Sequence, residues 1–125
     1  MRYIFALLLC FPLLIAAQVF DDFEDGDFTS DPQWTGTGDK FVVNDNKQLQ
    51  LNDTEESISY LSTANSMISE TEWRFWAKCS FSPSGNNNGR FYLVSDQEDV
   101  TLSLNGYFLQ LGEAGGDDAI ELFRQ

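Results

Sequence analysis

The residues best suited to chemistry in this chain are carboxylates that lie close together. Five acids occur within "DDFEDGDF", residues 21–28, with two phenylalanines and a glycine. In an extended segment Asp21, Asp25 and Asp27 share one face with Phe23, and their charges beside a core aromatic would be costly without a counter-ion. Carboxylate oxygens are the ligands that Ca²⁺ prefers. The stretch therefore predicts an edge strand that runs into a turn, with a structural calcium ion as the one cofactor.

A simpler interpretation of these acids needs no metal. Asp25 and Asp27 would solvate a turn, and Asp21 would precede the strand. The EF-hand pattern fails, because the third position of a loop starting at Asp21 is Phe23 and the last ligand position is Pro32. Both interpretations stay open on the sequence alone.

A second group of candidates is aromatic. Four predicted strands each place one aromatic side chain on their more polar face: Trp76, Tyr92, Phe108 and Phe123. The polar companions on these faces are Arg74 and Lys78, Arg90, Gln110 and Glu121, respectively. If the strands are neighbours, the four rings form a stripe suited to stacking on sugar rings, with polar partners for the hydroxyls. The alternative, which we favour, is that this face is covered by another layer or by loops.

Other chemistry is excluded by composition. The chain has no histidine, which removes the usual zinc ligand and every Ser–His or Cys–His nucleophile pair. With 7 basic residues against 20 acidic ones the net charge is −13, which opposes binding to nucleic acids and to anionic membranes. Cys79 shares one face of its predicted strand with Trp73 and Phe75 and is predicted to be an inert core thiol.

The first residues have the pattern of a targeting segment. "MRYIFALLLCFPLLIAA", residues 1–17, has a basic start, a short apolar run and two small residues at its end, as secretory signal peptides do. An apolar run of about 15 residues is too short to span a membrane. We therefore expect cleavage after Ala17, no membrane insertion afterwards, and a secreted or cell-surface protein.

The remaining chain, residues 18–125, alternates apolar and polar residues with a period of two, which predicts strands. The predicted strands cover residues 41–44, 48–51, 57–62, 72–81, 90–95, 106–112 and 119–124. Gly-, Asn- and Ser-rich connectors join them, and no stretch has convincing helical periodicity. The pattern predicts one all-β domain, an antiparallel sandwich. Because the last strand is followed by no closing turn, we expect this chain to be the front part of a longer domain.

Three stretches of the chain together resemble a known domain: "DDFEDGDFTSDPQWTGTGDKFVVND", "LQLNDTEESISYLST" and "GYFLQLGEAGGDDAIELFRQ". They are similar to the start of the concanavalin A-like (laminin G-like) jelly-roll domain found at the N-terminus of secreted bacterial lamin-tail-domain proteins. The resemblance covers nearly all of residues 18–125. It implies a jelly-roll sandwich at the cell surface or outside the cell, with a ligand-binding or structural role. The later strands of the domain are not matched, so functions that reside there do not carry over.

The resemblance also calls for a test of catalytic carboxylates, because jelly-roll domains include glucanases. Those enzymes carry Glu-x-Asp-x-x-Glu on one strand, whereas "GDDAIE" has Asp118 and Glu121 but Gly116 in the first position. A retaining glycosidase needs both carboxylates. We therefore expect no enzymatic activity from the chain as given.

Three functions follow as hypotheses. The first is a secreted, non-enzymatic sandwich module that binds extracellular carbohydrate or a cell-surface protein. The second is the front part of a glycoside hydrolase or lyase whose catalytic residues lie beyond Gln125. The third is a structural spacer without a ligand.

Overall fold

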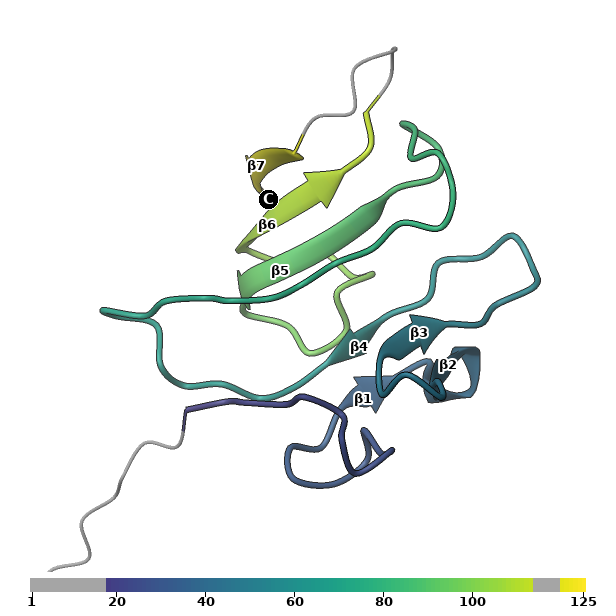
Figure 1. Ribbon diagram of the computed structural model, residues 1–125. Helices are drawn as coiled ribbons and strands as arrows, with labels where there is room; N and C mark the ends of the chain where they lie inside the picture. Colours follow the sequence, from purple (N-terminus) through teal and green to yellow (C-terminus); the bar gives the residue numbers. More distant parts are fainter. Residues whose placement is uncertain (1–17, 114–119) are drawn as a thin grey trace, which may run out of the picture.

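The computed structural model describes residues 18–113 and 120–125, and these form short antiparallel strands with one three-residue 3-10 turn (Figure 1). The predicted all-β class is confirmed. The predicted signal peptide and Asp118 lie outside the described residues. In the described part of the chain, no helix has the length and hydrophobicity that a membrane crossing requires.

Two of the three sheets are small. β1 (Thr35–Gly36) pairs with β4 (Leu61–Ser62), and β2 (Phe41–Val43) pairs with β3 (Leu49–Leu51) directly after the 3-10 turn η1 (Gly38–Lys40). Both strands of the β2–β3 hairpin were predicted, and Asn44 closes its turn by accepting the backbone N–H groups of residues 46 and 48. Short polar side chains stabilise such turns by this kind of bond.

Glycine is required at one position of the first small sheet. Gly36 has a φ of 135°, and a Cβ at this residue would lie 2.3 Å from the carbonyl oxygen of Tyr60. Both facts exclude an ordinary side chain where β1 approaches β4.

The third sheet is larger and has the order β5 (Gly89–Ser95), β6 (Gly106–Leu111), β7 (Ile120–Arg124). All three strands were predicted to within one residue at each end. The pairing places Phe91, Leu109 and Leu122 in one row across the sheet, and Tyr92, Phe108 and Phe123 in the next. Because neighbouring residues of a strand point to opposite faces, these two rows lie on opposite sides of the sheet. A bulge after Tyr92 shifts the register at the end of β5.

Three predicted strands are corrected. Residues 72–81 belong to no strand and end in a bend at Ser80 and Phe81, residues 57–62 contribute only β4, and "DDFEDGDF" forms turns. Figure 1 shows the 72–81 segment running beside β5, and the rings of Phe75 and Phe91 stack across this boundary at 4.8 Å. Among the described residues no backbone-to-backbone hydrogen bond involves residues 72–81. Alternating hydrophobicity was therefore present without the pairing that makes a strand.

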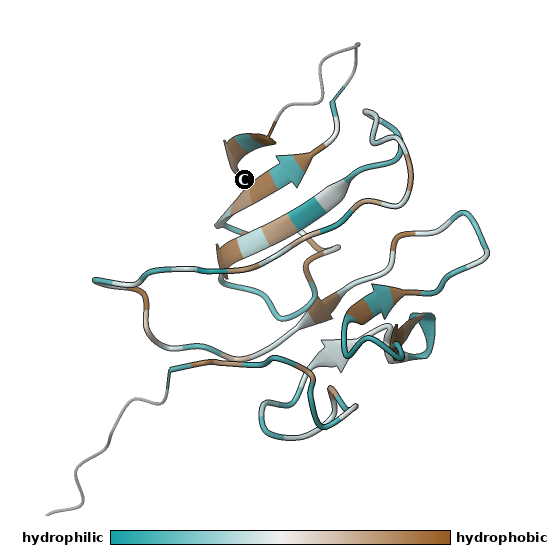
Figure 2. Ribbon diagram, viewed as in Figure 1, coloured by the Kyte–Doolittle hydropathy of each residue, from teal (hydrophilic) through white to brown (hydrophobic). Residues whose placement is uncertain are grey.

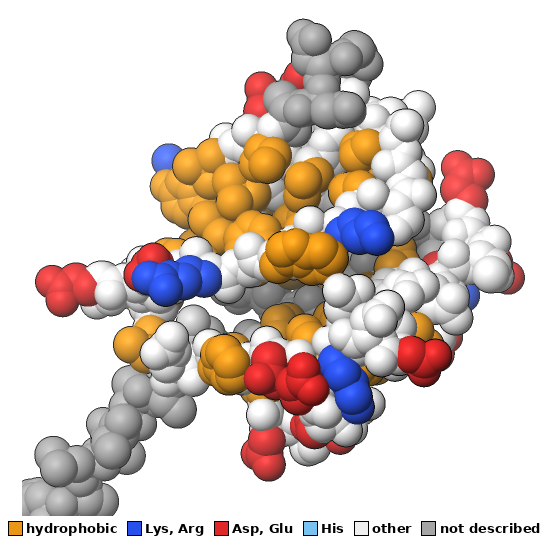
Figure 3. Space-filling model, in the orientation of Figure 1, with side chains coloured by type: hydrophobic (Ala, Val, Ile, Leu, Met, Phe, Trp, Pro, Cys, Tyr) orange, Lys and Arg blue, Asp and Glu red, His pale blue; other side chains and the backbone are white. Residues whose placement is uncertain are grey.

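The core is small. Leu104 (7% exposed) and Phe108 (6%) are the buried hydrophobic residues in the described ranges, whereas 13 large hydrophobic residues are exposed. Brown and teal segments alternate along β5 and β6 in Figure 2, and hydrophobic side chains gather over the visible face of the three-stranded sheet in Figure 3. The larger sets of contacts between elements lie within the sheets. The predicted jelly-roll sandwich is therefore not confirmed and stays a prediction.

The connection between β5 and β6 contacts the β1–β4 sheet. Thr35 of β1 donates its hydroxyl hydrogen to Glu98 at 2.5 Å, and Glu98 lies in the connection between β5 and β6. Burial and the neighbouring Asp99 raise the pKa of the Tyr60 phenol just before β4. The β5–β6 connection thereby holds the β1–β4 pair near the larger sheet.

Candidate functional site

The predicted calcium ligands are engaged in turns. Asp21 accepts the backbone N–H of Phe23 at 2.8 Å through one carboxylate oxygen and the Trp34 indole N–H at 2.8 Å through the other. Asp25 accepts the backbone N–H of Asp27 at 3.0 Å. Each aspartate thus closes the turn that follows it, and the Trp34 bond fixes the first turn against a tryptophan whose ring centroid lies 6.3 Å from that of Phe23.

Asp27 is engaged in the same way. It accepts both the backbone N–H and the hydroxyl of Thr29, and the Ser30 hydroxyl at 2.9 Å. These bonds, led by the one from the Thr29 backbone, lower the pKa of Asp27. Residues 18–113 and 120–125 contain no group of three or more such side chains placed to hold a metal ion. A calcium site at Asp21, Asp25 and Asp27 stays a prediction that this geometry does not support.

Three of the four predicted aromatic residues come together. Tyr92, Phe108 and Phe123 are direct cross-strand neighbours, with ring centroids 4.9 Å apart for the first pair and 5.2 Å for the second. The Arg90 guanidinium lies 5.1 Å from the centre of the Phe108 ring, and its Nε donates to Gln110 at 3.0 Å. Three of the four rings of the predicted row are thus adjacent, with their polar companions in the row beside them, and a ligand-binding role for them stays a prediction.

This aromatic row is the packed side of the sheet. Phe108 is 6% exposed, and the buried side chain of Leu104 lies beside Gly106, at the start of the strand that carries Phe108. The Tyr92 hydroxyl donates to the Gln125 side chain at 2.8 Å. A ligand could stack on Phe108 only after this packing opened.

Trp76 stands in different surroundings from the other three. It belongs to no strand and is 67% exposed, and the nearby Trp73 and Phe75 are 39% and 49% exposed. Arg74, its predicted polar companion, is held by Glu72 through two hydrogen bonds of 2.8 and 3.2 Å. Residues 73–76 therefore present a cluster of accessible rings, which we call the aromatic segment.

The aromatic segment lines a wide cleft. The cleft is open, and residues from Gln18 to Thr101 line it, among them Tyr60, Leu61, Trp73, Phe75, Trp76 and Phe91. Sequence reasoning missed it, because its lining comes from most of this range and not from one motif.

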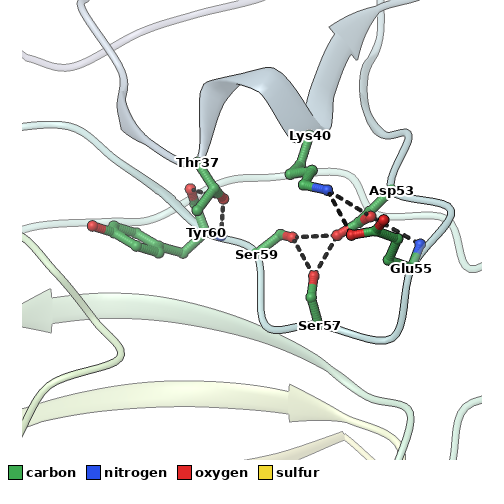
Figure 4. Close-up of polar contacts among 7 residues, drawn as sticks. All are labelled: Thr37, Lys40, Asp53, Glu55, Ser57, Ser59 and Tyr60. Atoms are coloured by element: carbon green, nitrogen blue, oxygen red, sulfur yellow. Dashed lines mark hydrogen bonds and ion pairs between the residues drawn. The ribbon is translucent and has the colours of Figure 1, made fainter.

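A polar network supports one wall of this cleft. The Asp53 side chain, 5% exposed, accepts hydrogen bonds from Lys40 (3.2 Å), Ser59 (2.9 Å), Ser57 and the Glu55 backbone (3.0 Å) (Figure 4). The Ser57 bond is the main cause of a lowered pKa of Asp53, and the bond to Asp53 raises the pKa of Lys40. Both serine hydroxyls donate to a carboxylate that is already shared, so neither is activated as a nucleophile. The network is a clamp between η1 and the segment before β4.

Thr37 extends this clamp to the next turn. Its hydroxyl accepts the Tyr60 backbone N–H at 2.8 Å and lies 3.1 Å from the Tyr60 carbonyl oxygen (Figure 4). The predicted strand over 57–62 is therefore replaced by side-chain bonds up to residue 60. A local signal for this existed, because Asp53, Ser57 and Ser59 are short polar residues that compete with strand pairing.

Comparison of the chain with protein-family models, curated proteins and solved structures found no match.

Proposed function

We propose that this chain is a non-enzymatic, extracellular β-sandwich module that binds carbohydrate through the aromatic segment and the cleft beside it. The observation that carries the proposal is the exposure of Trp76 at the cleft, with Trp73 and Phe75 partly exposed next to it. Flat aromatic rings stack on the apolar faces of sugars, while polar groups bind the hydroxyls. Lys78 and the asparagines of the 86–88 loop line the same cleft and supply such groups. The predicted secretion and the jelly-roll resemblance agree with this role.

The proposal is tested by polysaccharide binding of the native chain and of Trp76→Ala. Loss of one stacking contact is expected to weaken binding about tenfold, since tenfold corresponds to about 1.4 kcal/mol. Tyr107→Ala is the matched control, because Tyr107 is 44% exposed on β6 and does not line the cleft. Affinity electrophoresis against a panel of neutral and acidic polysaccharides gives the measurement. Equal binding by native protein and Trp76→Ala, or no binding to any polysaccharide, would contradict the proposal.

A structural role in a surface assembly is a second candidate. It is favoured by the exposed apolar residues of β7, Ile120 (66%) and Leu122 (63%), which a partner would cover. The hydrolase alternative gains less, because Glu121 is exposed on an outer strand and its companion in the motif, Asp118, lies outside the described residues.

A further inference from the structure

The segment before the 86–88 loop has an unused backbone edge. Residues 71–79 contain no turn or bend and form an elongated run beside β5 (Figure 1), and within the part of the chain that the structure describes no backbone-to-backbone hydrogen bond is made by residues 72–81. The segment is nevertheless held beside β5 by the Phe75–Phe91 stack, with an interplanar angle of 15°. Backbone N–H and C=O groups in an extended segment are obligatory hydrogen-bonding groups and a ready template for another strand.

This edge lies in the longest stretch of residues 18–125 that contains no acidic residue. From Trp73 to Ser95 there is no Asp or Glu, but there are three basic residues: Arg74, Lys78 and Arg90. The whole chain carries a net charge of −13. A second copy of this acidic chain would therefore meet little repulsion at this edge and substantial repulsion at the acidic residues 21–56.

We propose that two copies of the chain pair through residues 71–79 as antiparallel strands related by a two-fold axis at Phe75. The centre of the extended stretch is Phe75, so this register uses all nine residues. It places Glu72 opposite Lys78 and Arg74 opposite Trp76, and the symmetry makes each pair twice. Opposite charges and a cation over an indole ring are both favourable cross-strand pairs.

The adjacent registers are disfavoured by charge. Moving the axis to Arg74 places that arginine opposite its own copy, and moving it to Trp76 places Arg74 opposite Lys78. Like charges directly opposite each other destabilise a sheet. Centring on Phe75 also brings Trp73 opposite Ala77, which leaves space for the large ring. The pairing and carbohydrate binding both use Trp76, but their tests are separate, because cross-linking and sedimentation are measured without carbohydrate.

Disulfide trapping tests the register. In a Cys10→Ser background, Thr71→Cys places a thiol opposite Cys79 of the second copy, and mild oxidation is expected to give a covalent dimer. Within one copy these two positions are too far apart to react, because eight extended residues span about 26 Å. Ala77→Cys is the matched control on the same face and is expected not to cross-link. Trp73→Cys reports the register centred on Trp76, in which residue 73 opposes Cys79.

A charge reversal tests the pairing without cysteines. Lys78→Glu places a carboxylate opposite Glu72 at both symmetric positions, and its dimer dissociation constant in sedimentation velocity is expected to rise at least about tenfold. Adding Glu72→Lys restores opposite charges and is expected to return the constant to near the native value. Circular dichroism checks that each variant keeps its β structure.

The proposal is overturned by a native chain that stays monomeric up to about 200 µM. It is also overturned by a dimer that Lys78→Glu leaves unchanged, by cross-linking of Ala77→Cys or Trp73→Cys in preference to Thr71→Cys, or by a double variant that does not recover. A monomer with residues 71–79 protected from hydrogen exchange would show that the chain itself covers this edge.

Discussion

Replacing Phe108 by leucine should destabilise the protein strongly without any ligand being present. Leucine keeps most of the apolar surface but loses the two ring contacts, to Tyr92 at 4.9 Å and to Phe123 at 5.2 Å. Aromatic pairs contribute about 0.5–1.5 kcal/mol each beyond their buried area. Loss of the Arg90 guanidinium over the ring adds about 0.5–1 kcal/mol. We therefore expect the free energy of unfolding to fall by about 1.5–4 kcal/mol.

Urea denaturation followed by tryptophan fluorescence measures this change. The control is Tyr107→Leu, because Tyr107 is 44% exposed and points to the other face of β6. Its effect is expected to stay within about 0.5 kcal/mol, as for most surface substitutions. Equal effects of the two substitutions would refute the assignment of Phe108 to the core. A Phe108→Leu protein of native stability with lost carbohydrate binding would instead restore Phe108 as a ligand residue.

Three further predictions follow from the turns and the clamp. Gly36→Ala should cost about 1–3 kcal/mol because of its positive φ and the nearby carbonyl, whereas Gly38→Ala, with 3.6 Å to its nearest atom, should be nearly neutral in thermal denaturation. The pKa of Asp53 is lowered, chiefly by Ser57, so its stabilisation is present above the unfolded value of 3.8 and is lost as the pH falls through the lower folded value. The melting temperature should fall below about pH 4, and less steeply in Asp53→Asn; parallel curves would contradict this. Calcium at about 5 mM should leave the melting temperature unchanged, since the carboxylates of residues 21–28 already accept turn hydrogen bonds, and a rise of several degrees would re-establish the calcium site.

The strands that the sequence predicted well are those whose partners are their neighbours in the chain. β5, β6 and β7 follow one another, and their alternation and polar connectors specify both the strands and the pairing. The segment 72–81 has equally clear alternation, yet it is not a strand in the described structure. Alternating apolar and polar residues indicate which side chains can be buried on one face, whereas a strand also requires a hydrogen-bonding partner. That partner is a property of the fold, which a periodic pattern does not contain.

The predictions for the candidate site also succeeded within adjacent strands and failed elsewhere. The alternation of side chains between the two faces of a strand correctly grouped Tyr92, Phe108 and Phe123, because their three strands are adjacent. The same alternation was a poor guide to Asp21, Asp25 and Asp27, because it assumes an extended chain and these residues lie in turns. Short polar side chains that bond the backbone two residues further on were the better guide there.

Pairing among the described strands is almost entirely local, and this sets an order for folding. β2 pairs with β3, and β5, β6 and β7 pair in succession, whereas β1 and β4 enclose the β2–β3 hairpin between them. Local contacts require little loop closure and form fast, so the hairpin and the three-stranded sheet should form first. Closure of β1 on β4 would then be a late event after the main barrier. Substitutions at Gly36 should accordingly speed unfolding while leaving the folding rate nearly unchanged.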